Sequence, residues 1–197
     1  LVERPVYDEF LAAFTATTQA IAVGDPLDTT TEMGPMISAG QRQTSLDYLE
    51  IGAAEGARLV CGGEVPDGPG FYLRPAVVAD VHNSMRIARE EIFGPVVSVI
   101  PFDTEADAVA IANDSEYGLS GTLWTRDVGR AIRVGKAVLH DLLRTWLPRL
   151  EPGGTAYLVV AKNLGSDSLQ RWIATDLGMP CERYVTSRGF RVLTVTG

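Results

Sequence analysis

Short apolar segments alternate with helical patterns along the whole chain, and glycine or proline residues separate them. The spacing of apolar residues predicts amphipathic helices at residues 6–22 and 39–55. Strands are predicted at residues 58–61, 96–102 and 121–125. Because strands that alternate with helices are typical of α/β folds, we assign the chain to the α/β class. Its apolar runs are far shorter than the ~20 residues that span a bilayer, so we expect a soluble, cytoplasmic protein with no membrane partner.

Polar residues mark the starts of several helices. Ser38 with Gln41 and Thr104 with Asp107 have the spacing of capping boxes, and Asp127 is placed to cap a further helix. In such a box the first side chain accepts a hydrogen bond from the backbone of the second residue. The side chain of the second residue then reaches back to the start of the helix. We therefore expect helices to begin directly after each of these residues.

The last third of the chain repeats the alternation. Apolar residues between Leu139 and Leu150 recur at the spacing of one helical face. The sequence of residues 156–161 (AYLVVA) is typical of a strand buried on both faces of a sheet. A helix that begins at Asp167 and a hairpin formed by residues 182–186 and 190–196 are predicted to follow.

Charge is divided unevenly between two parts of the chain. Residues 1–135 contain 20 acidic and 9 basic side chains, a balance of −11, whereas residues 136–197 contain 5 and 8, a balance of +3. Such asymmetry is expected of two parts with different partners or of two parts with different origins, and chance also produces it. A surplus of three positive charges is too small to indicate a nucleic-acid partner.

The cysteines and histidines form no recognisable catalytic or metal-binding pattern. Cys61 and Cys181 lie far apart and outside any CxxC motif, so neither a disulfide framework nor a metal site is expected. Cys61 precedes two glycines, as a nucleophile on a tight turn would, but a free cysteine is more often a small buried apolar residue. His82 and His140 are isolated, and we interpret both as structural or surface residues.

The segment Arg89–Val97 (REEIFGPVV) is the most unusual in the chain. It places the adjacent carboxylates Glu90 and Glu91 before the ring of Phe93, a Gly-Pro turn and an apolar strand. At the mouth of a sheet, a carboxylate can accept hydrogen bonds from two neighbouring hydroxyls of a ligand, and a ring can pack on a flat heterocycle. From residue chemistry alone, a solvated pair of charges followed by a core phenylalanine is the simpler interpretation.

The string EEIFGPV resembles the signature of the NAD(P)-dependent aldehyde dehydrogenase superfamily. The agreement covers about residues 1–135 and includes, in order, LVERPVYDEF, GDPLD, CGGE, GFYLRPAVV, MRIAREEIFGPVVSV and ANDSEYGLSGTLWTRD. The resemblance implies part of the sheet and helices of an aldehyde dehydrogenase catalytic domain, NAD(P) as cofactor and an aldehyde as the small-molecule partner. It also implies that Glu91 contacts the nicotinamide ribose, that Phe93 packs beside it, and that Tyr117 and Leu119 are structural marks of the family.

The same resemblance places the catalytic groups elsewhere. The family's nucleophilic cysteine, which attacks the aldehyde as a thiolate, normally lies a few residues before the position of Leu1. The general-base glutamate and the Rossmann half that binds the cofactor lie further upstream, and Cys61 does not align with the nucleophile. We therefore expect no catalytic residue in these 197 residues and little or no turnover by them.

Residues 136–197 resemble the C-terminal end of a class I S-adenosylmethionine-dependent methyltransferase of the kind that modifies ribosomal RNA guanine. The resemblance is carried by the PGG turn, the strand LVVAKNLG, the helix DSLQRW and the hairpin around RGFRVL, and it implies the last strands and helices of a Rossmann-like sheet. The family's Gly-rich cofactor loop is not found, so we expect no S-adenosylmethionine binding.

We interpret the chain as two partial domains, 1–135 and 136–197, joined within residues 132–137. Its expected function is that of an aldehyde dehydrogenase-like oxidoreductase. The alternatives are a remnant of an RNA methyltransferase and a non-enzymatic fusion. In each case, sheet edges left unpaired would favour self-association.

Overall fold

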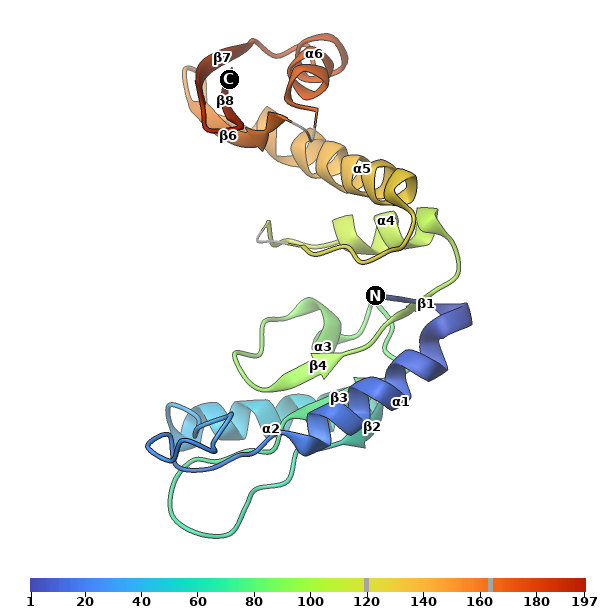
Figure 1. The fold of residues 1–197 in the computed structure, drawn as a ribbon, viewed down its shortest axis with the longest axis vertical. Helices are drawn as coiled ribbons and strands as arrows, with labels where there is room; N and C mark the ends of the chain where they lie inside the picture. Colours follow the sequence, from blue (N-terminus) through green and yellow to red (C-terminus); the bar gives the residue numbers. More distant parts are fainter. Residues whose placement is uncertain (119–120, 163–164) are drawn as a thin grey trace. The chain divides into compact units, whose positions relative to one another are not determined.

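The computed structural model describes residues 1–118, 121–162 and 165–197. The chain divides into two compact units, unit 1 (Leu1–Ser115) and unit 2 (Glu116–Gly197) (Figure 1). Strands and helices alternate in both units, which confirms the mixed α/β class. In the part of the chain that the structure describes, no helix is long and apolar enough to cross a membrane.

Unit 1 is built around a three-stranded sheet in the order β2-β3-β4, in which β3 runs antiparallel to β2 and parallel to β4. A separate parallel pair joins β1 to β5. The elements of unit 1 are β1 (Val2–Glu3), α1 (Arg4–Ala20), α2 (Ala39–Ala54), β2 (Arg58–Cys61), β3 (Ala76–Ala79), α3 (Arg86–Arg89), β4 (Val96–Ser98), β5 (Pro101–Phe102) and α4 (Glu105–Asn113).

The strand predicted at residues 96–102 is two strands. The backbone N–H of Val99 still donates to Val78 O of β3, at 2.8 Å, but Ile100 O accepts instead from the N–H of Val2, at 2.9 Å. The chain therefore leaves one sheet and joins the other between these two residues. The pattern of residues 96–102, apolar except for Ser98, does not predict such a change of neighbour.

The core of unit 1 lies on both faces of β3. All four residues of this strand are at most 2% exposed. Ala76 and Val78 pack in a cluster with Leu49 of α2 and Ile87 of α3, and the alternate residues Val77 and Ala79 pack in a second cluster with Tyr7 and Leu11 of α1. Because successive side chains of a strand point to opposite faces, this one short strand holds α1 against one face and α2 against the other.

Unit 2 contains α5 (Val128–Trp146), a single 3₁₀ turn (Leu147–Arg149), β6 (Thr155–Ala161), α6 (Ser166–Asp176), β7 (Cys181–Ser187) and β8 (Phe190–Thr196). Strand β8 lies between β6 and β7 and is antiparallel to both, so the predicted hairpin is confirmed. The apolar cluster of this unit joins Leu143 and Leu147 to Ile173 of α6 and to Leu193 of β8.

Three expectations for the second half of the chain are wrong. Residues 121–125 form no strand, and Trp124 is 89% exposed. The helix expected after Asp127 and the helical pattern of residues 139–150 meet in one helix, α5, which runs through residues 132–137 without interruption and ends at Trp146, before the 3₁₀ turn. Strand β6 is buried on one face only, because α5 and α6 pack on one side of the sheet. Leu119 and the NL of the LVVAKNLG motif lie outside the described residues.

The two histidines lie in different units. His82 is exposed in unit 1. His140, on α5, stacks on Trp172 of α6 with ring centroids 3.9 Å apart. Partial burial of the imidazole, assisted by the positive charges of Arg144 and Lys136, lowers the pKa of His140. These positions agree with a structural or surface role for each histidine.

Candidate functional site

Glu91 and Phe93 lie in the irregular segment between α3 and β4. Both residues are exposed, and Phe93 is 74% exposed. The interpretation of Phe93 as a core phenylalanine is therefore wrong. Its backbone also has a φ of 53°, in the left-handed region. For a residue with a Cβ this conformation costs roughly 1–2 kcal/mol, so neighbouring contacts have to hold it.

Helix α2 supplies the contacts that hold this segment. The side-chain amide of Gln41 donates hydrogen bonds to the carbonyl oxygens of Ile92, at 2.7 Å, and Phe93, at 3.2 Å. The N-terminal cap of α2 is confirmed, since Ser38 Oγ accepts from the backbone N–H of Gln41 at 3.1 Å. The second hydrogen bond of the predicted capping box, from the Ser38 backbone to the Gln41 side chain, is not formed. The Gln41 amide binds the segment before β4 instead.

Gly94 lets the segment approach α2 closely. A methyl group on its Cα would lie 2.1 Å from Ser45 Oγ and 3.1 Å from Ser45 Cβ. Ser45 is fully buried, and its hydroxyl donates to Gln41 O at 3.2 Å. A side chain at position 94 would therefore push the segment away from α2 and from the Gln41 amide.

Glu90 is engaged by neighbours on both sides. Its carboxylate accepts two hydrogen bonds from the Arg86 guanidinium, each 2.9 Å long, and one from the Tyr48 hydroxyl, 2.5 Å long. These donors favour the ionised carboxylate and lower the pKa of Glu90 to about 2. The same hydrogen bond to Glu90 raises the pKa of Tyr48.

Glu91 differs from its neighbour. Its side chain is exposed, and among the described residues it makes no hydrogen bond or ion pair. An ionised carboxylate is a pure acceptor that can take hydrogen bonds on both oxygens. Of the two adjacent carboxylates, Glu91 is therefore the one available to the hydroxyl groups of a ligand.

Neither cysteine has the environment of a nucleophile. Cys61, at the end of β2, is buried, and burial raises the pKa of its thiol. Cys181, at the start of β7, is half-buried, and burial raises the pKa of its thiol as well. A raised pKa reduces the fraction of reactive thiolate at neutral pH. Within the described residues, no group of three or more histidines, cysteines or carboxylates could hold a metal ion.

Sequence reasoning identified the segment but missed the residues that support it. The sequence predicts a helix cap at Gln41 and no role for Ser45 or Tyr48 beyond the helix of residues 39–55. Gln41 contacts Ile92 and Phe93, Ser45 contacts Gly94, and Tyr48 contacts Glu90, so each contact joins positions 42 or more residues apart. The polar side chains on one face of α2 are the one signal in the sequence, and they do not indicate which segment that face contacts.

Comparison with known proteins identifies the N-terminal two thirds of the chain. The sequence profile of the aldehyde dehydrogenase family matches residues 1–140. The chain belongs to the aldehyde dehydrogenase family. Similar curated proteins include the betaine aldehyde dehydrogenases of Rhizobium leguminosarum bv. trifolii and Sinorhizobium fredii, each 52% identical over 136 residues. These matches cover 68% of this chain and 28% of each relative, so the chain spans less than a third of their length.

Solved aldehyde dehydrogenases share the fold of this region. An aldehyde dehydrogenase from Mycobacterium tuberculosis, complexed with NAD⁺, is 51% identical with a TM-score of 0.67, over 70% of this chain and 29% of that one. The betaine aldehyde dehydrogenase of Staphylococcus aureus, in complex with NAD⁺, is 40% identical with the same TM-score, over 69% of this chain and 28% of that one. The predicted aldehyde dehydrogenase resemblance is thereby confirmed.

Substitution of Gly94 tests the close approach to α2. We expect Gly94→Ala to lower the free energy of unfolding of unit 1 by about 1–3 kcal/mol, because the added methyl group overpacks against buried Ser45. Gly40→Ala is the matched control, since a methyl group there lies 3.8 Å from its nearest neighbour. Urea denaturation followed by NMR signals of unit 1 measures the difference. Adding Ser45→Ala to Gly94→Ala should restore part of the loss, and an unchanged stability of Gly94→Ala would contradict the geometry.

The pH dependence of the free energy of unfolding below pH 4.5 tests the hydrogen bonds that Glu90 accepts. A carboxyl group with a lowered pKa stabilises the folded state above its unfolded pKa, near 4.5, and this contribution is lost as the pH falls through about 2. We expect Glu90→Gln to be less stable than the natural chain at pH 7, with a difference that shrinks steadily between pH 4.5 and pH 2. Glu50→Gln, on the exposed side of α2, is the matched control, because Glu50 makes no hydrogen bond or ion pair with a described residue that the substitution could break. A pH-independent difference would argue against the network.

Proposed function

We propose that residues 1–140 take part in the NAD(P)-dependent oxidation of an aldehyde to a carboxylic acid, with Glu91 and Phe93 at the nicotinamide ribose of the cofactor. The observation that carries this proposal is the difference in hydrogen bonding between two adjacent carboxylates. Glu90 accepts three hydrogen bonds from Arg86 and Tyr48, whereas Glu91 is exposed and accepts none from the described residues. The family match and the NAD⁺ complexes of related structures support it.

The residues present fit one end of a dinucleotide. The two oxygens of Glu91 match the two neighbouring hydroxyls of a ribose, and the exposed Phe93 ring offers an apolar surface beside them. The Gln41 amide keeps the backbone between them in place through two carbonyl oxygens. When bound, the cofactor supplies the hydride acceptor for the oxidation. The part of these residues is to orient it, so we name no catalytic residue among them.

The substrate is proposed only as an aldehyde. Relatives of 47–52% identity carry the name betaine aldehyde dehydrogenase, which points to an aldehyde with a quaternary ammonium group. The Mycobacterium tuberculosis enzyme is as similar, at 51%, and is named aldehyde dehydrogenase without a substrate. Because the chain is about equally similar to the betaine aldehyde dehydrogenases and to this enzyme, we propose no substrate narrower than an aldehyde.

The 197 residues on their own are proposed to turn over little or no aldehyde. The reaction requires a thiolate, and both Cys61 and Cys181 have thiols whose pKa is raised by burial. We expect the purified chain, mixed with NAD⁺ and betaine aldehyde, to form no NADH above the buffer rate, as measured by absorbance at neutral pH. Formation of NADH that disappears in Cys61→Ser would contradict this assignment.

Binding of a cofactor fragment tests the role of Glu91 directly. Because Glu91 and Phe93 would touch only the nicotinamide end, nicotinamide mononucleotide should shift the backbone amide NMR signals of residues 90–95 at millimolar concentration. Glu91→Gln keeps the shape of the side chain but removes its charge, and we expect it to weaken this binding about tenfold, the effect of losing charge-assisted hydrogen bonds.

Two ligands and one variant serve as controls in this titration. Adenosine monophosphate carries the other end of the dinucleotide and should leave residues 90–95 unshifted, and S-adenosylmethionine should leave unit 2 unshifted. Glu50→Gln should bind nicotinamide mononucleotide as the natural chain does. Equal shifts from both nucleotides, or an unchanged affinity in Glu91→Gln, would remove the basis for the assignment.

We further propose that residues 136–197 descend from a class I methyltransferase and were joined to the aldehyde dehydrogenase part, residues 1–135, within residues 132–137. The order of helix, turn, strand, helix and hairpin supports this, as does an apolar cluster formed within unit 2. The compact units divide at a different position, between Ser115 and Glu116, and α5 continues through the proposed join. Sequencing of the locus in independent isolates tests it: an uninterrupted aldehyde dehydrogenase gene in their place would contradict the fusion.

A further inference from the structure

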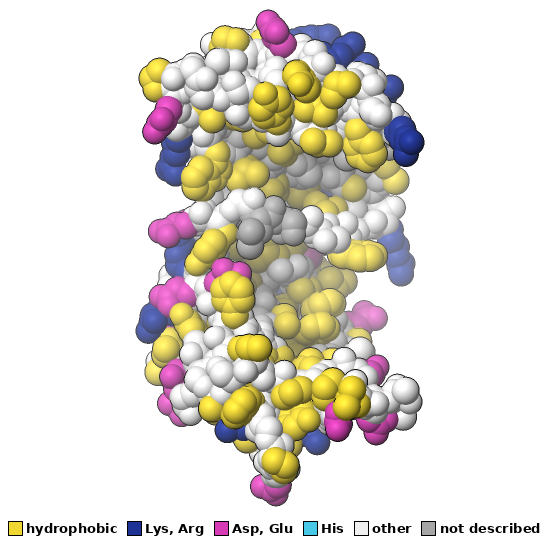
Figure 2. Space-filling model, turned by 90° about the vertical axis from the view of Figure 1, so that its left-hand side faces the viewer, with side chains coloured by type: hydrophobic (Ala, Val, Ile, Leu, Met, Phe, Trp, Pro, Cys, Tyr) yellow, Lys and Arg dark blue, Asp and Glu magenta, His cyan; other side chains and the backbone are white. Residues whose placement is uncertain are grey.

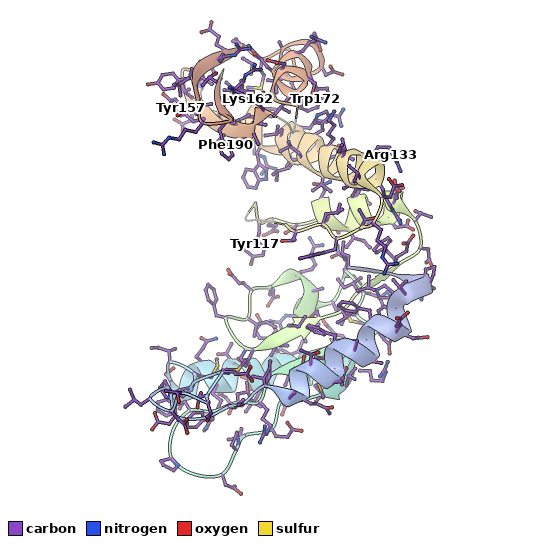
Figure 3. The ribbon with its side chains drawn as sticks, in the orientation of Figure 1. Tyr117, Arg133, Tyr157, Lys162, Trp172 and Phe190 are labelled. Atoms are coloured by element: carbon purple, nitrogen blue, oxygen red, sulfur yellow. The ribbon has the colours of Figure 1, made fainter. Side chains whose placement is uncertain are left out.

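The sheet of unit 2 has two faces with different surroundings. One face packs on α5 and α6 through Val160, Leu193 and Val195, each at most 9% exposed. The other face, here called the outer face, carries five exposed apolar residues: Tyr157 59%, Val159 69%, Tyr184 68%, Val185 46% and Phe190 51%. Hydrophobic side chains gather on the sheet side of this unit in the space-filling view (Figure 2), and Tyr157 and Phe190 are labelled in Figure 3.

The register of the strands makes the outer face continuous. Val159 of β6 lies opposite Val192 of β8, which lies opposite Val185 of β7. The rings of Tyr157 and Tyr184 meet edge to face, with centroids 5.5 Å apart. The apolar side chains therefore form one patch across three strands, and contiguous exposed patches of this kind mark interaction surfaces.

The charges around the outer face are separated along the strands. Glu151 and Glu182 lie at the end where β6 begins, since Gly154 N–H donates to Glu151 O and Glu182 lies opposite Thr194. Lys162 and Arg188 lie at the other end, where Lys162 N–H donates to Gly189 O in the turn after β7. All four side chains are exposed, and none forms an ion pair with a described residue.

We propose that the outer face binds the outer face of a second copy of this chain, with the strands of the two copies running in opposite directions. A two-fold axis between the sheets and perpendicular to the strands brings the acidic end of each copy against the basic end of the other. This arrangement is self-complementary, as a two-fold interface must be. It also gives the ~10 Å face-to-face packing that sheets adopt in sandwiches, and it goes beyond the cofactor site of unit 1.

The charge pattern is what selects a second copy over another occupant. A face with one sign of charge would repel its own copy, whereas a face with opposite charges at its two ends attracts a copy turned end to end. The apolar sequence of β6 on both of its faces is typical of a strand covered on both sides, and a second sheet would supply the missing cover.

Sedimentation of the full chain at low to high micromolar concentration tests the apolar part of the proposal. The natural chain should form a dimer, and Val159→Glu should raise the dissociation constant at least tenfold. Val128→Glu is the matched control, because Val128 is 73% exposed on α5, away from the sheet, and it should dimerise normally. A natural chain that stays monomeric, or a dimer that survives Val159→Glu, would overturn the proposal.

Charge reversal tests the orientation. The double variants Lys162→Glu/Arg188→Glu and Glu151→Lys/Glu182→Lys each place like charges at both ends, so each should dimerise more weakly than the natural chain. Mixed together, the two variants should form a heterodimer with an affinity restored toward that of the natural chain, and 0.5 M salt should weaken this recovery. Circular dichroism verifies that each variant is folded. Failure of folded variants to recover in the mixture would overturn the antiparallel arrangement.

Discussion

The burial of β3 on both faces is the constraint on which unit 1 depends. Its four residues, Ala76–Ala79, have small side chains and are almost fully buried. They separate the apolar cluster around α1 from the cluster around α2 and α3. The Tyr7 hydroxyl links the helix on one side to the sheet, since it donates to Val99 O and accepts from the N–H of Asp80. With α2 fixed against this sheet, its polar side chains can reach the segment before β4.

The candidate site shows how two chemically identical side chains acquire different properties. Glu90 accepts hydrogen bonds from Arg86 and Tyr48. These donors stabilise its ionised form and lower its pKa to about 2. Glu91, one residue later, projects into solvent with its acceptors unused by the described residues. The hydrogen bonds of Glu90 thus hold the backbone at this point, beside an exposed carboxylate whose oxygens can accept hydrogen bonds.

The two units have different relations to their surfaces. In unit 1 the strand with the most apolar sequence is covered on both sides, whereas in unit 2 the helices α5 and α6 cover one side of the sheet. An apolar sequence such as AYLVVA is compatible with cover on both sides, so the cover on the second side has to be inferred from the pattern of the outer face itself. Hydrophobicity alone does not say which partner covers the outer face, whereas the opposite charges at its two ends favour a second copy of the chain.

The sequence by itself determined the α/β class, the helix starts at Ser38, Thr104 and Asp127, the terminal hairpin and the family of about residues 1–135, because caps, turns and signature motifs depend on residues close in the chain. Only the tertiary structure decided that the strand at residues 96–102 is divided between two sheets and that Phe93 is exposed. It also decided that Gln41 supports the segment before β4. Each of these depends on which distant residue a side chain or a backbone group meets, and local patterns contain no record of that partner.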